Sequence, residues 1–406
     1  MRLSVPGSPH LTYCTNIHPG ETWREVRQNV EQHVLEVKRQ VSPTAPFGVG
    51  LRLSAVAADE LGHDRELDAF ASFLAESGLY VFTMNGFPYG AFHGTRVKEN
   101  VYRPDWLEPT RRTYTGRLAE ILARLLPNEP GMVGTISTVP GAFKPRVRGD
   151  GDVDAMAQQL RLQALDLHRL QQRTGKCISV ALEAEPSCFL ETLNETVAFF
   201  LEHLFSRTSI QAAATLGGVS LSEAELLLRD HLGVCVDTCH MAVEFEDGAR
   251  TRSTFAREGI RIDKVQLSAG IEVNVPPGSV DGTRGMRAFA EDTYLHQVVE
   301  SVNGAFERYV DLPEALAAFD RDRSASRRFR VHFHVPIFQQ HLGEFSTTQL
   351  DLSDWIDAAR TAHVTNHFEI ETYTWDVLPP ELRRGHVCDA IAREMSWALQ
   401  RFAAGG

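Results

Sequence analysis

Short apolar, β-branched runs alternate with segments of helical periodicity along the whole chain. In the helical segments apolar residues recur every three or four positions, as at Leu67, Phe70 and Leu74. This alternation predicts βαβ units and a parallel sheet. The expected strands are Leu11–Ile17, Gly48–Ser54, Leu79–Asn85, Val133–Val139, Ile178–Glu183, Gly233–Thr238, Lys264–Ser268, Phe329–Val335 and His367–Thr372.

Two parallel architectures fit this pattern, a doubly wound sheet and an eight-stranded (β/α)8 TIM barrel. The barrel is favoured because no GxGxxG or GxxxxGK[ST] phosphate loop follows the first strand. Polar residues also stand at the carboxyl ends of most strands, where a barrel builds its site. A barrel needs eight strands and the pattern gives nine, so Val133–Val139 is assigned as an extra strand on the rim.

Domain organisation and charge narrow the class further. We expect a single domain over residues 1–406, because no linker, repeat or low-complexity run interrupts the pattern. Gly- and Pro-rich segments at about 86–106, 140–150 and 270–285 are typical of long βα loops over a site. Hydrophobic residues make up 43% and charged residues 23%, as in ordinary soluble proteins. The formal net charge of −12 argues against a broad nucleic-acid surface, so no nucleic-acid partner is expected.

The lack of targeting signals and the spacing of the cysteines bear on the cellular location. No run approaches the roughly 20 apolar residues of a membrane span, and the first residues lack the apolar core of a signal peptide. The six cysteines are scattered without CxxC spacing. A cytoplasmic location is therefore expected.

Four expected strands end in groups that bind metals. Asp237 ends an apolar strand and His240 follows on the turn, although capping of the next helix by Asp237 would explain it as well. Glu183 and Glu185 lie two apart and share one side of their strand, where two carboxylates repel unless a cation or proton intervenes.

The other two of these four strands also carry groups that bind metals. Glu371 stands near the carboxyl end of the final strand, and His332 and His334 share one face of theirs. A divalent-metal site is the best single explanation of all four strand ends.

These residues resemble the xylose-isomerase-like TIM barrel superfamily, which includes sugar epimerases, sugar-phosphate isomerases and endonuclease IV. The segment Gly233–His240 is similar to a metal-binding Asp-Thr-Cys-His segment, Leu182-Glu183 to a strand end that supplies a bridging ligand, and Ile370-Glu371-Thr372 to the final-strand ligand. Gln266 stands where the superfamily carries a metal-binding histidine, and His334 is a substitute. The resemblance thus implies a Mn, Zn, Co or Mg ion held by Glu183, Asp237, Gln266 or His334, and Glu371, with Glu185 as the fallback for Glu183.

The whole chain also resembles the EboE family of metabolite traffic proteins, from about residue 10 to 400. The similar motifs are Leu11–Trp23, Asn85–Gly90, Phe92–Gly94 and Glu371–Pro379. The resemblance implies a part in moving or processing a metabolite with other Ebo proteins, among them a membrane prenyltransferase-like one. Such partners would bring the protein to the inner face of the membrane, and related epimerases are often homo-oligomers.

The reaction implied by the superfamily is proton transfer next to a carbonyl of a sugar or sugar phosphate. Glu183 and Glu371 would be the catalytic carboxylates. The residues expected to contact the substrate are His18, Tyr89, His93, Glu185, His240 and Trp375. A non-catalytic metabolite carrier is the main alternative, and an endonuclease IV-like phosphodiesterase is a weaker one because of the acidic net charge and Gln266.

Overall fold

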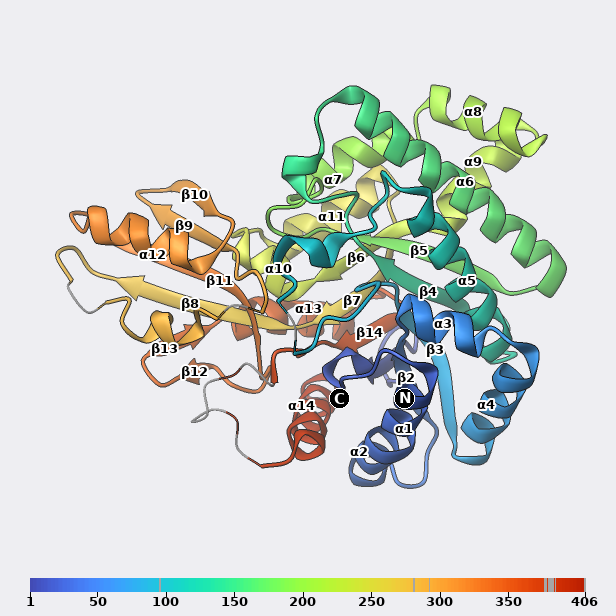
Figure 1. Cartoon of the computed structure of the whole chain (residues 1–406), viewed down its shortest axis with the longest axis horizontal. Coiled ribbons are helices and arrows are strands. Elements are labelled where there is room, and N and C mark those ends of the chain that lie inside the picture. The colour runs from blue at the N-terminus through green and yellow to red at the C-terminus, as the bar shows by residue number, and fades with distance from the viewer. Residues whose placement is uncertain are drawn as a thin grey trace.

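The computed structural model describes residues 1–406 except 95, 280–281, 292, 376–377, 379–382, 384 and 405–406. Its centre is an eight-stranded parallel sheet in the order β1-β14-β7-β6-β5-β4-β3-β2 (Figure 1). The strands are β1 (His10–Tyr13), β2 (Phe47–Arg52), β3 (Leu79–Asn85), β4 (Val133–Thr138), β5 (Cys177–Glu183), β6 (Leu232–Asp237), β7 (Ile262–Leu267) and β14 (His367–Ile370). A parallel bridge between Cys14 and Gly50 joins the β1 and β2 edges and closes the sheet. The predicted (β/α)8 barrel is confirmed.

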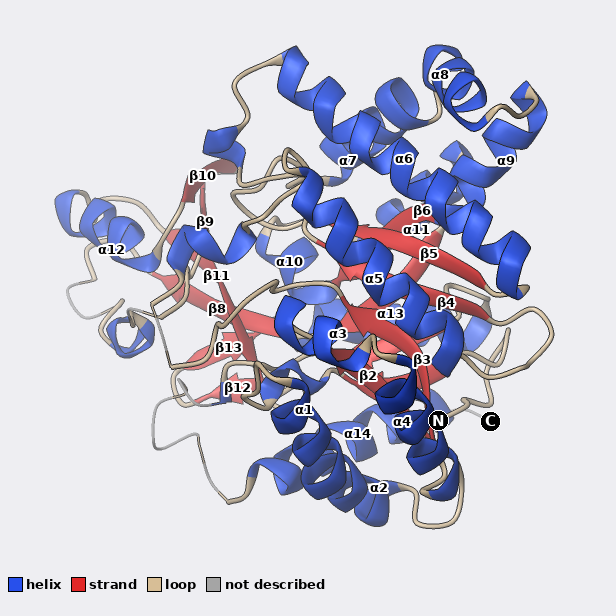
Figure 2. Cartoon of the chain, turned by 45° about the vertical axis from the view of Figure 1, so that its right-hand side comes forward, coloured by secondary structure: helices blue, strands red, loops and turns tan. Residues whose placement is uncertain are grey.

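Helices cover the outer side of the barrel, because each crossover between parallel strands packs its apolar face on the sheet (Figure 2). They are α1 (Trp23–Asn29), α2 (Leu35–Val41), α3 (Ala55–Leu61), α4 (Asp64–Glu76), α5 (Pro109–Leu125), α6 (Asp150–Thr174), α7 (Leu193–Phe199), α8 (Arg207–Gly217), α9 (Leu221–His231), α10 (Thr238–Val243), α11 (Gly248–Glu258), α13 (Gln349–Thr361) and α14 (Val387–Ala403). Local sequence sets their ends: Thr22 and Glu25 form a capping box at α1, and Gly175 (φ 71°) ends α6 in the left-handed region. Within the described residues, every helix is too short or too polar to cross a bilayer.

A second sheet is inserted between β7 and β14, on the left of Figure 1. Its strands are antiparallel in the order β10-β9-β11-β8-β13-β12. They are β8 (Ala269–Val275), β9 (Val298–Val302), β10 (Ala305–Tyr309), β11 (Arg327–Val335), β12 (His341–Leu342) and β13 (Phe345–Thr347), with helix α12 (Leu312–Arg321). The chain leaves β7 and enters β8 after one residue, so this inserted sheet (residues 269–347) starts at the carboxyl end of the barrel.

The inserted sheet corrects two expectations from the sequence. Val133–Val139 is not an extra rim strand, because Val133–Thr138 is barrel strand β4; the ninth strand, Phe329–Val335, belongs to β11 of the inserted sheet. The segment 270–285, expected as a loop, begins with strand β8. The first error arises because polar and apolar residues alternate in β11 as they do in a barrel strand, and the pattern does not say which sheet a strand joins. The second arises because the Gly and Pro residues of the segment were taken as loop signals, although polar and apolar residues also alternate in β8.

The barrel lumen carries a buried ion pair below the carboxyl end. Lys264 Nζ of β7 lies 2.5 Å from Glu369 Oε2 of β14, and both side chains are fully buried. Gly50 on β2 makes room for this pair, since a Cβ there would lie 1.8 Å from Glu369 Oε1. The buried polar residues of the lumen thus lie beneath the side chains at the carboxyl end of the barrel and hold them in place.

Candidate metal centre

The barrel supplies five polar side chains at its carboxyl end. Glu183 ends β5, Asp237 ends β6, Gln266 lies near the end of β7, Glu371 follows β14, and His240 lies in α10. His240 is 3.9 Å from Glu183 and 4.0 Å from Asp237, measured between ring nitrogens and carboxylate oxygens. All five are buried, so their charges interact in a low-dielectric surrounding.

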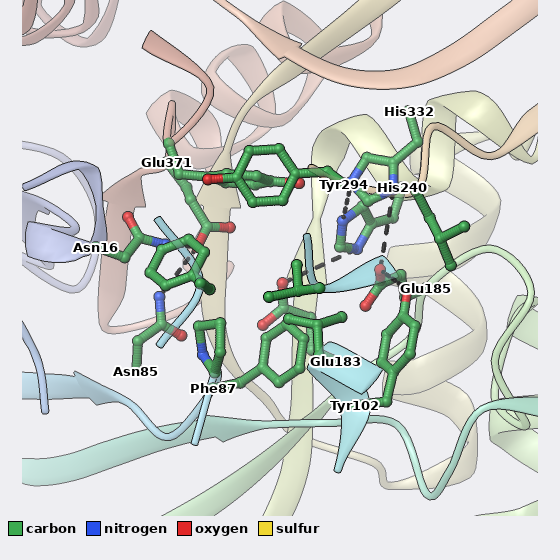
Figure 3. Close-up of a pocket in the computed structure, with 16 residues that line it drawn as sticks. Asn16, Asn85, Phe87, Tyr102, Glu183, Glu185, His240, Tyr294, His332 and Glu371 are labelled. Atoms are coloured by element: carbon green, nitrogen blue, oxygen red, sulfur yellow. Dashed lines mark hydrogen bonds and ion pairs between the residues drawn. The ribbon is translucent and has the colours of Figure 1, made fainter. Parts of the chain in front are cut away.

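The inserted sheet supplies two more groups, His332 and His334 of β11. His332 Nε2 lies 3.0 Å from His240 Nε2 (Figure 3). It also lies 3.2 Å from His334 Nε2. His334 Nε2 in turn lies 3.9 Å from Asp237 Oδ2. Because these histidines are two apart on one strand, they share its face, as the sequence predicted. The site therefore lies at the junction of the barrel and the inserted sheet.

Each of the three histidines presents a lone pair to the others. The Nδ1 of each ring faces an oxygen that accepts hydrogen bonds, so each Nδ1 carries the proton and each Nε2 is bare. The acceptors are the Ala184 carbonyl for His240 (3.0 Å), the Gln297 side-chain oxygen for His332 (2.7 Å) and the Glu371 carbonyl for His334 (2.8 Å). Burial also lowers the pKa of His240 to about 4 and that of His332 well below its usual value. Neutral imidazoles of this tautomer are the form that binds metal ions.

This arrangement fits a divalent transition-metal ion. Bare nitrogens 3.0–3.2 Å apart cannot bond to one another, whereas Zn–N bonds of about 2.0–2.1 Å in a tetrahedron put neighbouring nitrogens about 3.3 Å apart. The donor atoms of His240, His332 and His334 all lie within 4.8 Å of one another, as do those of Glu183, Asp237 and His240. Imidazole with carboxylate is a ligand set for Zn, Mn, Fe or Co.

Asp237 caps a helix and still has an oxygen to spare. Its Oδ1 accepts from the N–H groups of Cys239 (2.8 Å) and His240 (3.0 Å) and from the Ser268 hydroxyl (2.6 Å). Its Oδ2 is buried and has no hydrogen-bond partner among the described residues. An unpaired buried carboxylate oxygen is costly, and a metal ion beside the histidines would satisfy it. Asp237 therefore caps α10, and its predicted role as a metal ligand stays a prediction.

Glu183 is held by Gln266, at the position where the resemblance in the sequence would place a metal-binding histidine. The Gln266 amide donates to both carboxylate oxygens of Glu183 at 2.8 Å. Burial and the nearby Asp237 raise the pKa of Glu183 to about 8. Gln266 thus orients Glu183, and its predicted role as a ligand stays a prediction.

Glu371 is fixed by two asparagines that the sequence reasoning missed. Asn16 and Asn85 donate to Glu371 Oε1 at 2.7 and 3.1 Å. Burial, followed by the charges of Glu183 and Asp237, raises the pKa of Glu371 well above its usual value. Both asparagines end expected strands, so their position was the available signal.

Glu185 belongs to a hydrogen-bonded chain behind His332. Tyr102 donates to Glu185 Oε1 at 2.5 Å, and the Gln297 amide donates to the Tyr102 hydroxyl at 2.8 Å. Burial raises the pKa of Glu185 to about 7. Because Gln297 also accepts from His332, this chain links the pocket wall to a candidate ligand. No pattern in the sequence pointed to Tyr102 or Gln297.

A pocket opens directly on these groups and contains about 590 Å³ of empty space, including its mouth. Glu183, Glu185, His240, His332 and Glu371 form its polar side (Figure 3). Residues 87–102 and residues 294–295 cover it, so the predicted loop at 86–106 lies over the site.

Four predicted substrate contacts lie outside the described pocket lining. His18 stacks on His33 and contacts the Tyr13 hydroxyl, and Tyr89 packs against Tyr114. Trp375 belongs to the hydrophobic core, while Asp376, Val377 and Pro379 of its motif lie outside the described residues. His93 Nε2 lies 2.6 Å from the carbonyl oxygen of Asn16, the residue that holds Glu371. Of the expected contacts, His240 and Glu185 line the pocket.

The fold and the site together define a (β/α)8 barrel with a candidate metal centre. No family model and no curated protein matches the chain. Among solved structures it is similar to a xylose isomerase-like TIM barrel protein from Mycobacterium smegmatis in complex with magnesium, with a TM-score of 0.47 and 11% identity, covering 98% of this chain and 97% of that one.

Two further solved structures are similar over nearly their whole length. They are the probable 3-DHS dehydratase AsbF from Bacillus anthracis (TM-score 0.45, 13% identity, 95% of this chain and 97% of that one) and an IOLI protein with a bound zinc atom (0.45, 11%, 97% and 99%). Likeness at this level does not carry an activity over to this chain.

Proposed function

We propose that the protein binds a divalent transition-metal ion at this centre and moves a proton next to a carbonyl group of a sugar-like substrate, as an isomerase or epimerase does. The observation that carries the proposal is the meeting of three imidazole Nε2 atoms, two of which belong to His240 and His332 of the pocket lining. His240, His332, His334 and Asp237 would hold the ion. When bound, the ion supplies Lewis acidity, which polarises a carbonyl and acidifies the adjacent C–H.

Glu183 and Glu371 are the groups that would carry the proton. Both line the pocket and both have a raised pKa, which is about 8 for Glu183, so Glu183 can be protonated or ionised near neutral pH. Gln266 fixes one carboxyl group, and Asn16 and Asn85 fix the other. Glu185 and the covering loop would bind and orient the substrate and exclude water.

The resemblance to the EboE family extends this proposal to the cellular location and the partners of the protein. We place the protein in the cytoplasm, where it would process a metabolite precursor together with other Ebo proteins, including a membrane prenyltransferase-like partner at the inner face of the membrane. A carrier without turnover is the alternative outcome, and activity measurements on metal-loaded protein separate the two.

The first test is the metal content of untagged protein by mass spectrometry. Wild type and His341→Ala, which removes an exposed histidine of the inserted sheet, should hold about one equivalent. His332→Ala and Asp237→Ala should lose the ion. Glu371→Ala should keep it if the histidines form the centre, and lose it if the carboxylate set implied by the superfamily does.

The second test is the reaction itself. Wild type loaded with metal should exchange a carbon-bound proton of a ketose for deuterium in D₂O, and Glu183→Gln should not. Absence of metal from the wild type, even after incubation with Zn or Mn, would contradict the metal centre. Retained metal without exchange for any sugar would favour the carrier.

A further inference from the structure

The pocket above the metal centre has two unlike walls. Its base is formed by three carboxyl groups, two histidines and two asparagines, whereas its cover is apolar and aromatic. Phe87, Phe92 and Val101 come from the loop after β3, Tyr294 and Leu295 from the inserted sheet, and Tyr373 from the segment after β14. Among the described lining residues there is no lysine or arginine. Such a pocket favours a ligand with hydroxyl groups on one side and C–H groups on the other.

Lys98, which lies between the cover residues Val97 and Val101, has no donor left for a ligand. A lysine ammonium has three N–H donors. Those of Lys98 face the carbonyl oxygens of Glu291 (3.0 Å) and Tyr294 (2.6 Å) and the Asp311 carboxylate (2.7 Å). Its charge is therefore used to hold the segment that carries Tyr294, not to receive an anion.

Arg52, at the end of β2, is committed in the same way. Its guanidinium donates to the carbonyl oxygens of Gly20, Pro88 and Gly90 and to the Glu21 carboxylate. The group lies over the Phe92 ring at 5.2 Å. Lys264 is buried against Glu369 below the site. The N–H groups at the start of α10 are taken by Asp237, so this helix end offers nothing to a phosphate either.

From this charge pattern we propose that the substrate is a neutral hydroxylated compound and not a phosphate ester. Phosphate recognition uses free Arg or Lys donors or the N–H groups of a helix end; the described lining has no Lys or Arg, and the N–H groups at the start of α10 are taken. A phosphate dianion would also lie beside Glu183, Glu185 and Glu371, and any of these carboxyl groups that is ionised would repel it. This inference rests on the proposed metal-dependent function. It excludes sugar phosphates from the substrates expected for that function.

The test compares D-fructose with D-fructose 6-phosphate on the full chain loaded with zinc. Saturation-transfer NMR gives the two dissociation constants, and the metal content of the same samples is measured. We expect D-fructose to bind at least about tenfold more tightly. Equal or tighter binding of the phosphate ester, or binding of neither compound to zinc-loaded protein, would overturn the inference.

A charge-inserting variant makes the test sharper. Val101→Arg places a guanidinium in the pocket cover and should improve binding of D-fructose 6-phosphate about tenfold. Its matched control is Val56→Arg, a change at a valine that is 53% exposed on α3, which should leave both constants unchanged. An unchanged constant for the phosphate ester in Val101→Arg would contradict the role assigned to charge. Samples that hold no zinc mark failure of the proposed function, whereas zinc-loaded samples that prefer the phosphate ester mark failure of this inference alone.

Discussion

The barrel and the inserted sheet contribute different chemistry to one site. The barrel presents carboxyl groups at its strand ends, Glu183, Asp237 and Glu371, whereas the inserted sheet presents the imidazoles of His332 and His334. The barrel alone brings Glu183, Asp237 and His240 together, whereas the cluster of three histidines needs both regions. A metal ion at their junction would therefore fasten the inserted sheet to the barrel as well as activate a substrate.

The two regions also differ in how they depend on ions. The barrel has an internal counter-ion, since Lys264 pairs with Glu369 inside the lumen. The junction has an unpartnered Asp237 oxygen and three facing lone pairs. The barrel should thus be stable without metal, while the inserted sheet should depend on it.

The largest expected effect is on the barrel. Lys264→Met leaves Glu369 buried without its partner, and the free energy of unfolding in urea should fall by about 3–5 kcal/mol. Arg2→Met, which breaks the exposed pair with Glu129, is the control and should cost at most about 1 kcal/mol. The double variant Lys264→Met/Glu369→Leu should recover most of the loss. Equal costs for Lys264→Met and Arg2→Met would show that the lumen pair does not hold the barrel.

Metal removal should destabilise the inserted sheet and not the barrel. With free zinc at about 100 times its dissociation constant, binding stabilises the bound form by about 2.7 kcal/mol, or about a hundredfold in the opening equilibrium. Chelation should therefore speed amide hydrogen exchange in β8 and β11 by up to that factor and leave β4 and β5 unchanged. His332→Ala should exchange at the fast rate with or without zinc. Uniform acceleration across both regions would contradict a metal that joins them.

The same contrast explains what the sequence could predict. Strand–helix alternation and polar strand ends gave the barrel and the carboxylates at Glu183, Asp237 and Glu371, because both are local, periodic signals. The inserted sheet was missed, since β8 pairs with β11 over more than 50 residues of chain and no local pattern encodes that pairing. For the same reason the shared face of His332 and His334 was predicted, but their meeting with His240 was not. Gln297 and Tyr102 gain their roles only through tertiary contacts.

A third prediction concerns acid stability and tests a barrel histidine far from the metal. His231 ends α9, is buried, and faces the Ile178 carbonyl at 2.7 Å. Burial lowers its pKa from 6.5 to about 4. The unfolded chain then binds the proton first, so stability is full above about pH 6.5 and is lost as the pH falls towards 4.

The measurement is the free energy of unfolding in urea at about pH 7 and pH 5. Wild type should lose about 2 kcal/mol more than His231→Leu over this interval, at about 1.4 kcal/mol per unit of pKa shift. Other buried histidines contribute equally to both proteins, so the difference isolates His231. Parallel pH profiles would show that this histidine is not held neutral by the fold.

The smallest effect should come from the residue that joins the two regions through hydrogen bonds alone. Gln297 precedes β9, accepts from His332 Nδ1 at 2.7 Å and donates to Tyr102 at 2.8 Å. Gln297→Leu removes the acceptor that fixes the His332 tautomer, and zinc affinity should fall about tenfold, the lower end for such outer contacts. Competition with a fluorescent chelator measures the change, and Gln340→Leu, an exposed position in the same inserted sheet, is the control.

A general loss of structure would lower affinity in any Gln297 variant, so a conservative variant separates the two causes. Gln297→Glu keeps an oxygen that accepts from His332 Nδ1 and should retain zinc affinity, although it loses the donor to Tyr102. If Gln297→Glu and Gln297→Leu weaken zinc binding equally, Gln297 acts through packing. If only Gln297→Leu does, the hydrogen bond from His332 to Gln297 inside the inserted sheet is what aligns His332 with the barrel carboxyl groups.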